Sequence, residues 1–389
     1  MNSDDAIAFG EKVLAMLDQG SFTATYKYAV LLALIDACME HTDAHGRAPA
    51  RLHPSVLANR VIELYWPQTG LYGDAHGEAP VVLRQNSGGQ AEIVSLVHRY
   101  RAAVDPTGHA PIARARAANP QGYERLVRDV TWKLVQMPLP RLQRFGKTDE
   151  RFLYDLAWDE RVGRRAYEAG NVDNELRLRP GVGEHLVRLA GLLRPLVQQQ
   201  WAARVVQFNR SAVPSLNEQG ELEAFLFGAQ RLDLSPVRGD LVELQNGDCF
   251  YCAGRLRRTV DIDHFLPWAR HPDNGIFNLV AAHDACNNRK RDFLAATAHV
   301  ARWSERFHRT DLSRDLRSIA VRRKWAAQPD RTFSVARAVY LRLPAEARLW
   351  VAGDEFVGPD HDVLATALTG ARQAQAAEAH ASFDSGADE

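Results

Sequence analysis

The sequence has few cysteines and no long apolar segment. Only four of its 389 residues are cysteine, too few for a disulfide framework, so we expect a reducing compartment and a cytoplasmic protein. No apolar run approaches the ~18 residues that a membrane-spanning helix needs, and the opening segment MNSDDAIAFG is acidic. We therefore expect neither a secretory signal nor a membrane span.

A net charge is also absent, because 48 Lys and Arg residues balance 48 Asp and Glu residues. This balance excludes a uniformly basic coat for nucleic acid but allows local basic patches. Residues 302–324 hold eight basic and three acidic residues among aromatic side chains, which suits either a nucleic-acid groove or an amphipathic helix. Residues 353–389 reverse the balance, with eight acids and a single arginine.

The length of the chain indicates two or three domains, because a single core seldom grows past ~250 residues. Most segments have the apolar period of helices, so the predicted fold class is mainly α, in a multidomain α+β arrangement. The predicted parts are a helical N-terminal domain (1–110), a helical middle domain (111–244), a small module (245–300), a basic helical region that packs on the module (301–360) and an acidic, disordered tail (361–389).

The N-terminal domain has two interpretations. Residues 23–42, 54–66 and 90–104 have helical patterns, with Cys38 in the first of them as a core residue, and residues 79–85 are typical of a short strand. These pieces suit a winged-helix DNA-binding domain or a small helical packing domain.

The middle domain is predicted to be helical as well. Residues 184–210 are expected to form one long helix with a kink at Pro195. The arginines along this helix are expected to be solvated or, alternatively, to contact phosphates.

Two pairs of metal-ligand residues lie on either side of a thirty-residue segment. The four residues are Cys249, Cys252, His283 and Cys286. A two-residue gap lets one tight turn direct both side chains at the same ion, and sulfur and imidazole donors suit tetrahedral zinc. The alternative is that the cysteines are small buried residues and the histidine is a core residue with satisfied hydrogen bonds.

The segment between the pairs alternates like two short strands, VDIDH and FNLVAAH, and CNNRKRDFLA follows with the character of a helix. We therefore expect a zinc-stapled unit of two strands and one helix. Asp263 and His264 end the first strand, Asn278 opens the second, and Asn287 begins the helix.

This arrangement resembles the HNH endonuclease family, whose module is known as ββα-metal. The matching residues are Asp263-His264, Pro267, Asn278-Leu279-Val280, Cys286-Asn287 and Lys290. The resemblance covers residues 249–292, about a ninth of the chain. It implies hydrolysis of phosphodiester bonds with structural Zn²⁺ and catalytic Mg²⁺ or Mn²⁺.

The residue types suit that chemistry. His264 can take a proton from water near neutral pH, and Asp263 offers a hard oxygen to Mg²⁺. The resemblance further implies that Asn287 completes the metal site and that Asn278 braces the loop that holds His264. Three basic residues of the helix are expected to hold backbone phosphates: Arg289, Lys290 and Arg291.

Each of these residues also has a simpler interpretation. Asp263 and His264 can form a surface pair, Asn278 can form a turn, and Asn287 can cap the helix. In the loop between the strands, His271 is expected to be exposed, and Trp268 is expected to pack under the loop or to stack on a sugar or base.

The predicted function is a metal-dependent HNH endonuclease that nicks or cuts DNA, with RNA as a further candidate substrate. A role as the effector of a restriction or anti-phage defence system, with a protein partner, fits such an enzyme. Two alternatives are a zinc-stapled nucleic-acid-binding or scaffold protein with vestigial chemistry, and a nuclease that is active only with a partner.

Overall fold

The protein is mainly helical, as predicted, and its strands are short. The computed structural model describes residues 3–19, 23–73, 80–105, 110–145, 148–170, 173–213, 216, 219–227, 233–257 and 259–369. The chain divides into two compact units, one from residues 1–38 and 48–232 and the other from residues 39–47 and 233–389. Among the helices described, none combines the length and apolarity that crossing a membrane requires.

The first unit contains a helix that is apolar on all sides. This helix, α2 (Tyr26–Glu40), lacks a polar face, and nearly all of its side chains from Tyr28 onwards are buried. Cys38 is fully buried near its end, as expected of a core cysteine. The last residues of α2, Met39 and Glu40, belong to the second unit.

Buried ion pairs join three helices of the first unit. Asp36 of α2 is fully buried and lies 2.6 Å from Arg60 of α3 (Pro54–Tyr65). Its other carboxylate oxygen binds Arg194 of α9 (Ala190–Asn209). The expectation that the arginines of this segment are solvated is therefore wrong for Arg194, whose charge is paired in the interior.

The predicted long helix at 184–210 is two helices. α8 (Val182–Arg188) ends at Arg188, Leu189 caps it, and α9 begins at Ala190 with Pro195 inside it. Pro195 is the sixth residue of α9, past the first turn, so it removes the hydrogen bond that its position would donate to the carbonyl of Gly191. The helical pattern is divided at Leu189, before the proline, and α9 continues through Pro195.

The remaining elements of the first unit include a small sheet in the order β1–β5–β4. The elements are α1 (Ser3–Gln19), β1 (Arg51–Leu52), η1 (Pro67–Thr69), α4 (Glu92–Val104), α5 (Ile112–Ala118), α6 (Pro120–Gln136), η2 (Leu139–Arg141), β2 (Arg144–Phe145), β3 (Thr148–Asp149), β4 (Tyr154–Asp155), α7 (Arg164–Glu168), β5 (Leu176–Leu178) and α10 (Gln219–Leu226).

The predicted boundary at residue 110 does not separate two domains. β1 pairs with β5, and α3 packs against α6, so segments on both sides of the boundary share one unit. The strand predicted at 79–85 is also missing from the described residues 80–85, where Val81 forms only an isolated bridge with Tyr72. The winged-helix alternative therefore lacks its strand.

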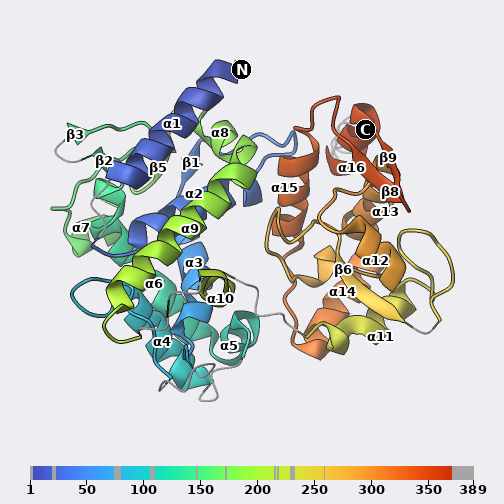
Figure 1. Ribbon diagram of the computed structural model, residues 1–389, viewed down its shortest axis with the longest axis horizontal. Helices are drawn as coiled ribbons and strands as arrows, with labels where there is room; N and C mark the ends of the chain where they lie inside the picture. The colour runs from blue at the N-terminus through green and yellow to red at the C-terminus, as the bar shows by residue number, and fades with distance from the viewer. Residues whose placement is uncertain are drawn as a thin grey trace, which may run out of the picture. The chain divides into compact units, whose positions relative to one another are not determined.

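The second unit holds the 249–292 segment among helices from both sides of the sequence (Figure 1). Its elements are α11 (Ser235–Leu244), β6 (Val260–His264), η3 (Ile276–Asn278), β7 (Leu279–His283), α12 (Asp284–Lys290), α13 (Thr297–His308), α14 (Thr310–Arg323), α15 (Pro329–Tyr340), β8 (Leu349–Ala352), β9 (Glu355–Val357) and α16 (His361–Thr369).

The core of the second unit joins α11, β7 and α14. Its buried residues are Val237, Leu241, Ile276, Phe277, Leu279, Ala281, Leu316, Ile319 and Ala320. Trp303 of α13 stacks on Phe265, with ring centroids 4.6 Å apart. Because α11 packs against β7 in this core, the main segment of the unit begins at residue 233 and not at the predicted 245.

The tail predicted at 361–389 is helical where it is described. α16 covers residues 361–369 and buries Leu364 and Leu368, which lie one turn apart on the same face. The rest of the predicted tail, residues 370–389, lies outside the described residues.

Candidate functional site

Two antiparallel strands and a helix position the candidate residues. In the register of β6 and β7, Asp263 lies opposite Val280. Side chains alternate between the two faces of a strand, so Asp261 and Asp263 share one face of β6. α12 packs against this face, while Val260 and Ile262 of the other face pack on the core.

Cysteine and histidine donors converge beside this pair of strands. The donor atoms lie within 4.8 Å of one another and come from Cys249, Cys252, His283 and Cys286. A tight turn brings the first two together, because Ala253 donates its N–H to the carbonyl of Cys249 and adopts a φ of 55°. His283 ends β7 and Cys286 lies in the first turn of α12.

The donor set fits a structural zinc ion. Three sulfurs and one imidazole match the ligand types and the number of a tetrahedral zinc site. Cys252 is exposed, so the alternative that it is a small buried residue is wrong. Burial, with the neighbouring Cys249, raises the pKa of the Cys286 thiol to about 12. A bound cation favours the thiolate and offsets this effect.

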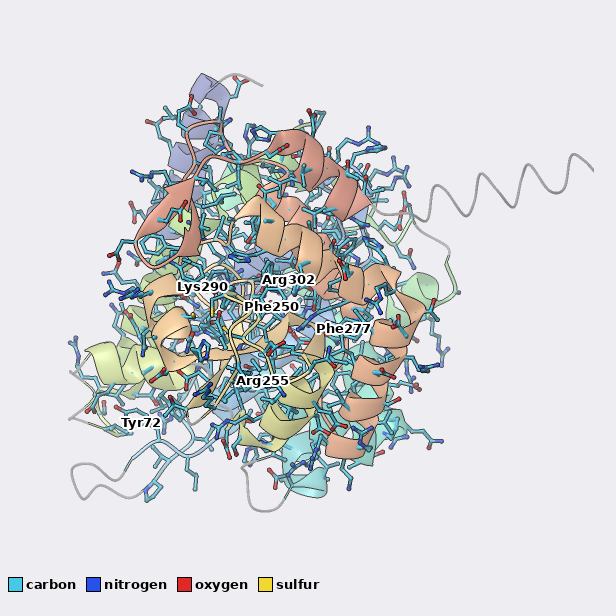
Figure 2. All side chains as sticks on the ribbon, turned by 90° about the vertical axis from the view of Figure 1, so that its right-hand side faces the viewer. Tyr72, Phe250, Arg255, Phe277, Lys290 and Arg302 are labelled. Carbon is cyan, nitrogen blue, oxygen red and sulfur yellow. The ribbon has the colours of Figure 1, made fainter. Side chains whose placement is uncertain are left out.

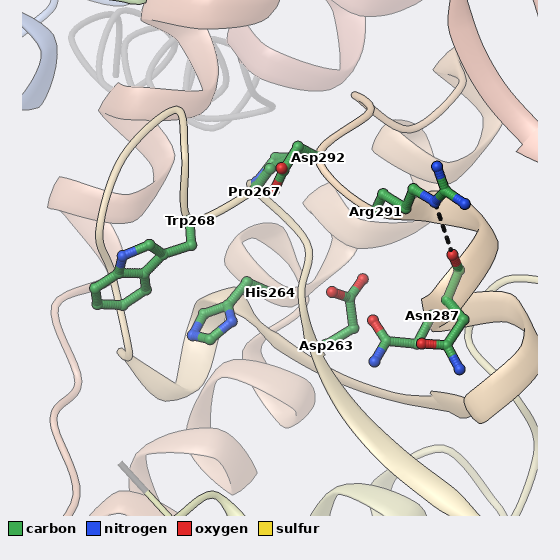
Figure 3. Close-up of a pocket in the computed structure, with 8 residues that line it drawn as sticks. Asp263, His264, Pro267, Trp268, Asn287, Arg291 and Asp292 are labelled. Carbon is green, nitrogen blue, oxygen red and sulfur yellow. Dashed lines mark hydrogen bonds between the residues drawn. The ribbon is translucent and has the colours of Figure 1, made fainter. Parts of the chain in front are cut away.

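A pocket of about 520 Å³ opens beside the strand end and α12 (Figure 3). It is lined by Asp263, His264, Pro267, Trp268, Asn287, Asn288, Arg291 and Asp292. Figure 3 shows the Asp263 carboxylate between the His264 ring and the side chain of Asn287. The pocket therefore brings together three of the four residues that the sequence singles out for chemistry.

His264 is held by a residue of the following loop. Its Nε2 lies 2.8 Å from Oδ1 of Asn274, and its ring meets Trp268 edge-on at 5.3 Å. A carbonyl oxygen only accepts, so Nε2 donates the proton and Nδ1 is left as an acceptor. Trp268 is half-buried and lies against the histidine at the wall of the pocket.

Asn278, the fourth residue, is fully buried and ties the same loop together. Its Oδ1 accepts from the N–H of Leu266 at 2.8 Å. Its Nδ2 donates to the carbonyls of Leu266 at 3.2 Å and Asp273 at 3.0 Å. Its amide therefore connects both ends of the loop that carries Asn274. A residue that only formed a turn would not need these three hydrogen bonds.

Asp263 is mostly buried, with 8% of its surface exposed. Its Oδ2 accepts from the hydroxyl of Tyr251 at 2.5 Å and lies 2.9 Å from Nζ of Lys290. Burial, together with the nearby Asp263 charge, raises the pKa of Tyr251 well above its usual value, so the phenol keeps its proton and donates.

Asn287 faces a second carboxylate of β6. Its Nδ2 donates to Oδ2 of Asp261 at 3.1 Å. In the described part of the chain, no hydrogen bond engages the side-chain oxygen of Asn287 or Oδ1 of Asp263. These two hard oxygens suit Mg²⁺ or Mn²⁺, so the residues present fit the catalytic metal that the resemblance implies.

The expectation that Lys290 holds phosphates is wrong. Its side chain is fully buried, and Nζ donates to the carbonyl of His264 at 2.9 Å as well as pairing with Asp263. Nζ of Lys290 also lies 5.7 Å from the ring centroid of Tyr251. The ring of the adjacent Phe250 is covered by the guanidinium of Arg302 at 4.6 Å, and Figure 2 labels Lys290, Phe250 and Arg302. Arg289 and Arg291 are exposed, and Arg291 lines the pocket.

The expected exposure of His271 is also wrong. Its ring is fully buried, and Nε2 lies 3.2 Å from a carboxylate oxygen of Glu40. The covering residue comes from the 39–47 segment, which is far from the loop in sequence. No local pattern signals such a contact.

Sequence reasoning missed three residues that contact the site: Tyr251, Asp261 and Asn274. A signal existed for Asp261, because the alternation in VDIDH places it on the same face as Asp263. The contacts of Tyr251 and Asn274 depend on how the loops close and have no comparable signal.

Comparison with known families yields two matches. Residues 251–296 match a family described as HNH endonuclease, which confirms the resemblance over this segment.

No curated protein and no solved structure matches the chain. The second family match is to a domain of unknown function (DUF8808) and covers residues 8–225. Because this match spans more than half of the 389 residues, the protein belongs to the DUF8808 family and carries an HNH endonuclease segment after the matched region.

Proposed function

We propose that the protein is a metal-dependent endonuclease that hydrolyses phosphodiester bonds in DNA. The observation that carries this proposal is the pocket that collects His264, Asp263 and Asn287 beside a four-donor metal cluster. The HNH endonuclease match over 251–296 supports a nucleic-acid substrate.

His264 is the proposed general base. Its Nε2 is engaged by Asn274, so Nδ1 is the nitrogen that accepts the proton of the attacking water. Trp268 and Asn274 restrict the imidazole, which keeps this nitrogen aligned in the substrate complex. Asn278 acts on His264 indirectly, because its hydrogen bonds hold the loop that contains Asn274.

Asp263 and Asn287 are the proposed ligands of Mg²⁺ or Mn²⁺. A bound cation supplies positive charge at the phosphate and stabilises the leaving oxygen. Arg289 and Arg291 lie exposed on and after α12, where they can contact the backbone phosphates that flank the scissile bond.

Zn²⁺ is proposed to have a structural role at Cys249, Cys252, His283 and Cys286. Fixing the two turns of the 249–292 segment also fixes the end of β7 and the beginning of α12. The expected cytoplasmic location, the role in restriction or anti-phage defence and the protein partner stay predictions.

Cleavage of a supercoiled plasmid tests the proposal. We expect nicked or linear product with Mg²⁺, none with EDTA, and none with the His264→Ala variant at unchanged zinc content and melting temperature. Losing a general base costs about 10²–10⁴ in rate. His361→Ala, which removes an exposed histidine at the beginning of α16, is the matched control and retains full activity.

The same assay separates the proposal from a binding or scaffold role. A protein that binds the plasmid but leaves it intact at every Mg²⁺ and Mn²⁺ concentration contradicts the enzyme. Parallel incubation with single-stranded RNA shows whether RNA is also cleaved.

A further inference from the structure

Two buried donors contact the same carboxylate oxygen, Oδ2, of the proposed cation ligand Asp263. Tyr251 and Lys290 both contact Oδ2, at 2.5 and 2.9 Å. Both donor residues are buried, whereas the carboxylate lines the pocket (Figure 3). Saturating Oδ2 leaves Oδ1 as the oxygen that can meet a cation, so the two donors select which lone pairs face the pocket.

Asn287 is oriented in the same way by Asp261. The amide of an asparagine can present either its oxygen or its nitrogen, and only the oxygen can bind a cation. Because Nδ2 donates to Asp261 at 3.1 Å, the amide is turned with its nitrogen toward β6. Its oxygen is therefore the atom left for a ligand.

Tyr251 also connects the proposed cation ligand Asp263 to the proposed zinc site. It lies in the two-residue gap between Cys249 and Cys252, so a metal held by the two thiols fixes the backbone on both sides of it. Its ring is packed edge-on against Trp350 at 5.2 Å and His299 at 5.4 Å, which leaves the hydroxyl little freedom to move away from Asp263.

We infer that Tyr251 and Asp261 are positioning residues, which hold Asp263 and Asn287 with one oxygen of each facing the pocket, and that Tyr251 thereby couples the cation site to the zinc site. The inference rests on the proposed function for the identity of the cation ligands. It adds two residues that contact neither cation nor substrate and act only through the ligands.

Titration of the zinc-loaded full chain with Mn²⁺, followed by calorimetry, tests the role of Tyr251. Loss of an outer hydrogen-bond partner typically weakens a metal site about 10–100-fold. We expect Tyr251→Phe to raise the dissociation constant for Mn²⁺ by about that factor, at unchanged zinc content.

Tyr154→Phe is the matched control. Tyr154 is an equally buried tyrosine of the first unit, and its hydroxyl donates to the carbonyl of Leu139 at 2.9 Å. This variant loses a buried hydroxyl without touching Asp263, and we expect its Mn²⁺ affinity to match the wild type. A Tyr251→Phe protein that binds Mn²⁺ as tightly as the wild type overturns the role of Tyr251.

Asp261 is tested with a pair of substitutions. Asp261→Asn retains an oxygen that accepts from Asn287, whereas Asp261→Ala removes it. If Asp261 positions Asn287, the alanine variant loses most of the Mn²⁺ affinity and the asparagine variant recovers a large part of it. Equal losses in both variants show that only the charge matters and overturn the positioning role.

The binding measurement separates this inference from the proposed function. If the wild type binds Mn²⁺ and the variants weaken binding as expected, but no nucleic acid is cleaved, the positioning role stands and the nuclease proposal fails. If cleavage occurs and the variants bind Mn²⁺ like the wild type, the nuclease proposal stands and this inference fails.

Discussion

Nε2 of His264 lies 2.8 Å from Oδ1 of Asn274, and the two residues sit on opposite sides of a loop whose ends are joined by the buried amide of Asn278. The backbone carbonyl of Asn274 also accepts from the indole N–H of Trp325 at 2.7 Å. Asn274, the partner of the proposed general base, is therefore held at two points. Its side chain contacts His264, and its backbone carbonyl contacts Trp325 in the segment that follows α14.

Removing the side-chain partner of His264 is expected to slow cleavage without weakening the cation site. In Asn274→Ala the imidazole loses its acceptor and samples other orientations, so we expect the rate to fall about 10–100-fold with an unchanged Mg²⁺ dependence. Asn274→Asp keeps an acceptor oxygen and should lose less activity. Plasmid cleavage rates at several Mg²⁺ concentrations check this, and equal rates for Asn274→Ala and wild type contradict it.

Replacing a zinc ligand is expected to affect folding as well as activity. Cys286→Ser should lose zinc and melt at a lower temperature, because a metal in so small a segment supplies much of its folding free energy. Elemental analysis and thermal denaturation measure both effects. Cys38→Ala, at the buried cysteine of α2, is the control and should keep one zinc per chain. A zinc-free wild-type protein would exclude the site.

Truncating the amide of Asn287 is expected to produce a defect that metal can rescue. In Asn287→Ala the cation loses one protein oxygen but retains Asp263 and the phosphate, so higher Mg²⁺ should restore part of the rate. The measurement is the Mg²⁺ concentration at half-maximal cleavage, which should rise while zinc content stays constant. A variant whose activity is lost equally at all Mg²⁺ concentrations argues that Asn287 acts in another way.

Two neighbouring basic residues are expected to differ in effect. Arg291 is exposed at the pocket, so Arg291→Ala should weaken DNA binding and reduce the slope of log affinity against log salt by about 1. Lys290 is buried and paired with Asp263, so Lys290→Met leaves a buried carboxylate unpaired and should cost about 3–5 kcal/mol of stability.

Binding at several salt concentrations and denaturant titration separate the two variants. If Lys290→Met instead retains full stability and loses DNA affinity, the lysine acts at the surface and the buried pair is not maintained in solution.

Local sequence features alone predicted which four cysteine and histidine donors converge, and the order of strand, strand and helix. The two-residue gaps and the alternation in VDIDH are local features, and local geometry follows from them without knowledge of the rest of the chain. For the same reason the family resemblance could be stated from residues 249–292 alone.

Tertiary structure alone decided the burial of Lys290 and His271 and the partners of Asp263. Lys290 is a charged residue in a run of basic residues, a pattern typical of a solvated helix, yet Asp263 and the carbonyl of His264 pair with it in the interior. His271 is covered by Glu40 from the end of α2. A charged or polar side chain can be buried only where ion pairs or hydrogen bonds with other groups offset the free-energy cost of removing it from water. Those groups are distant in the sequence and come together only when the whole unit folds.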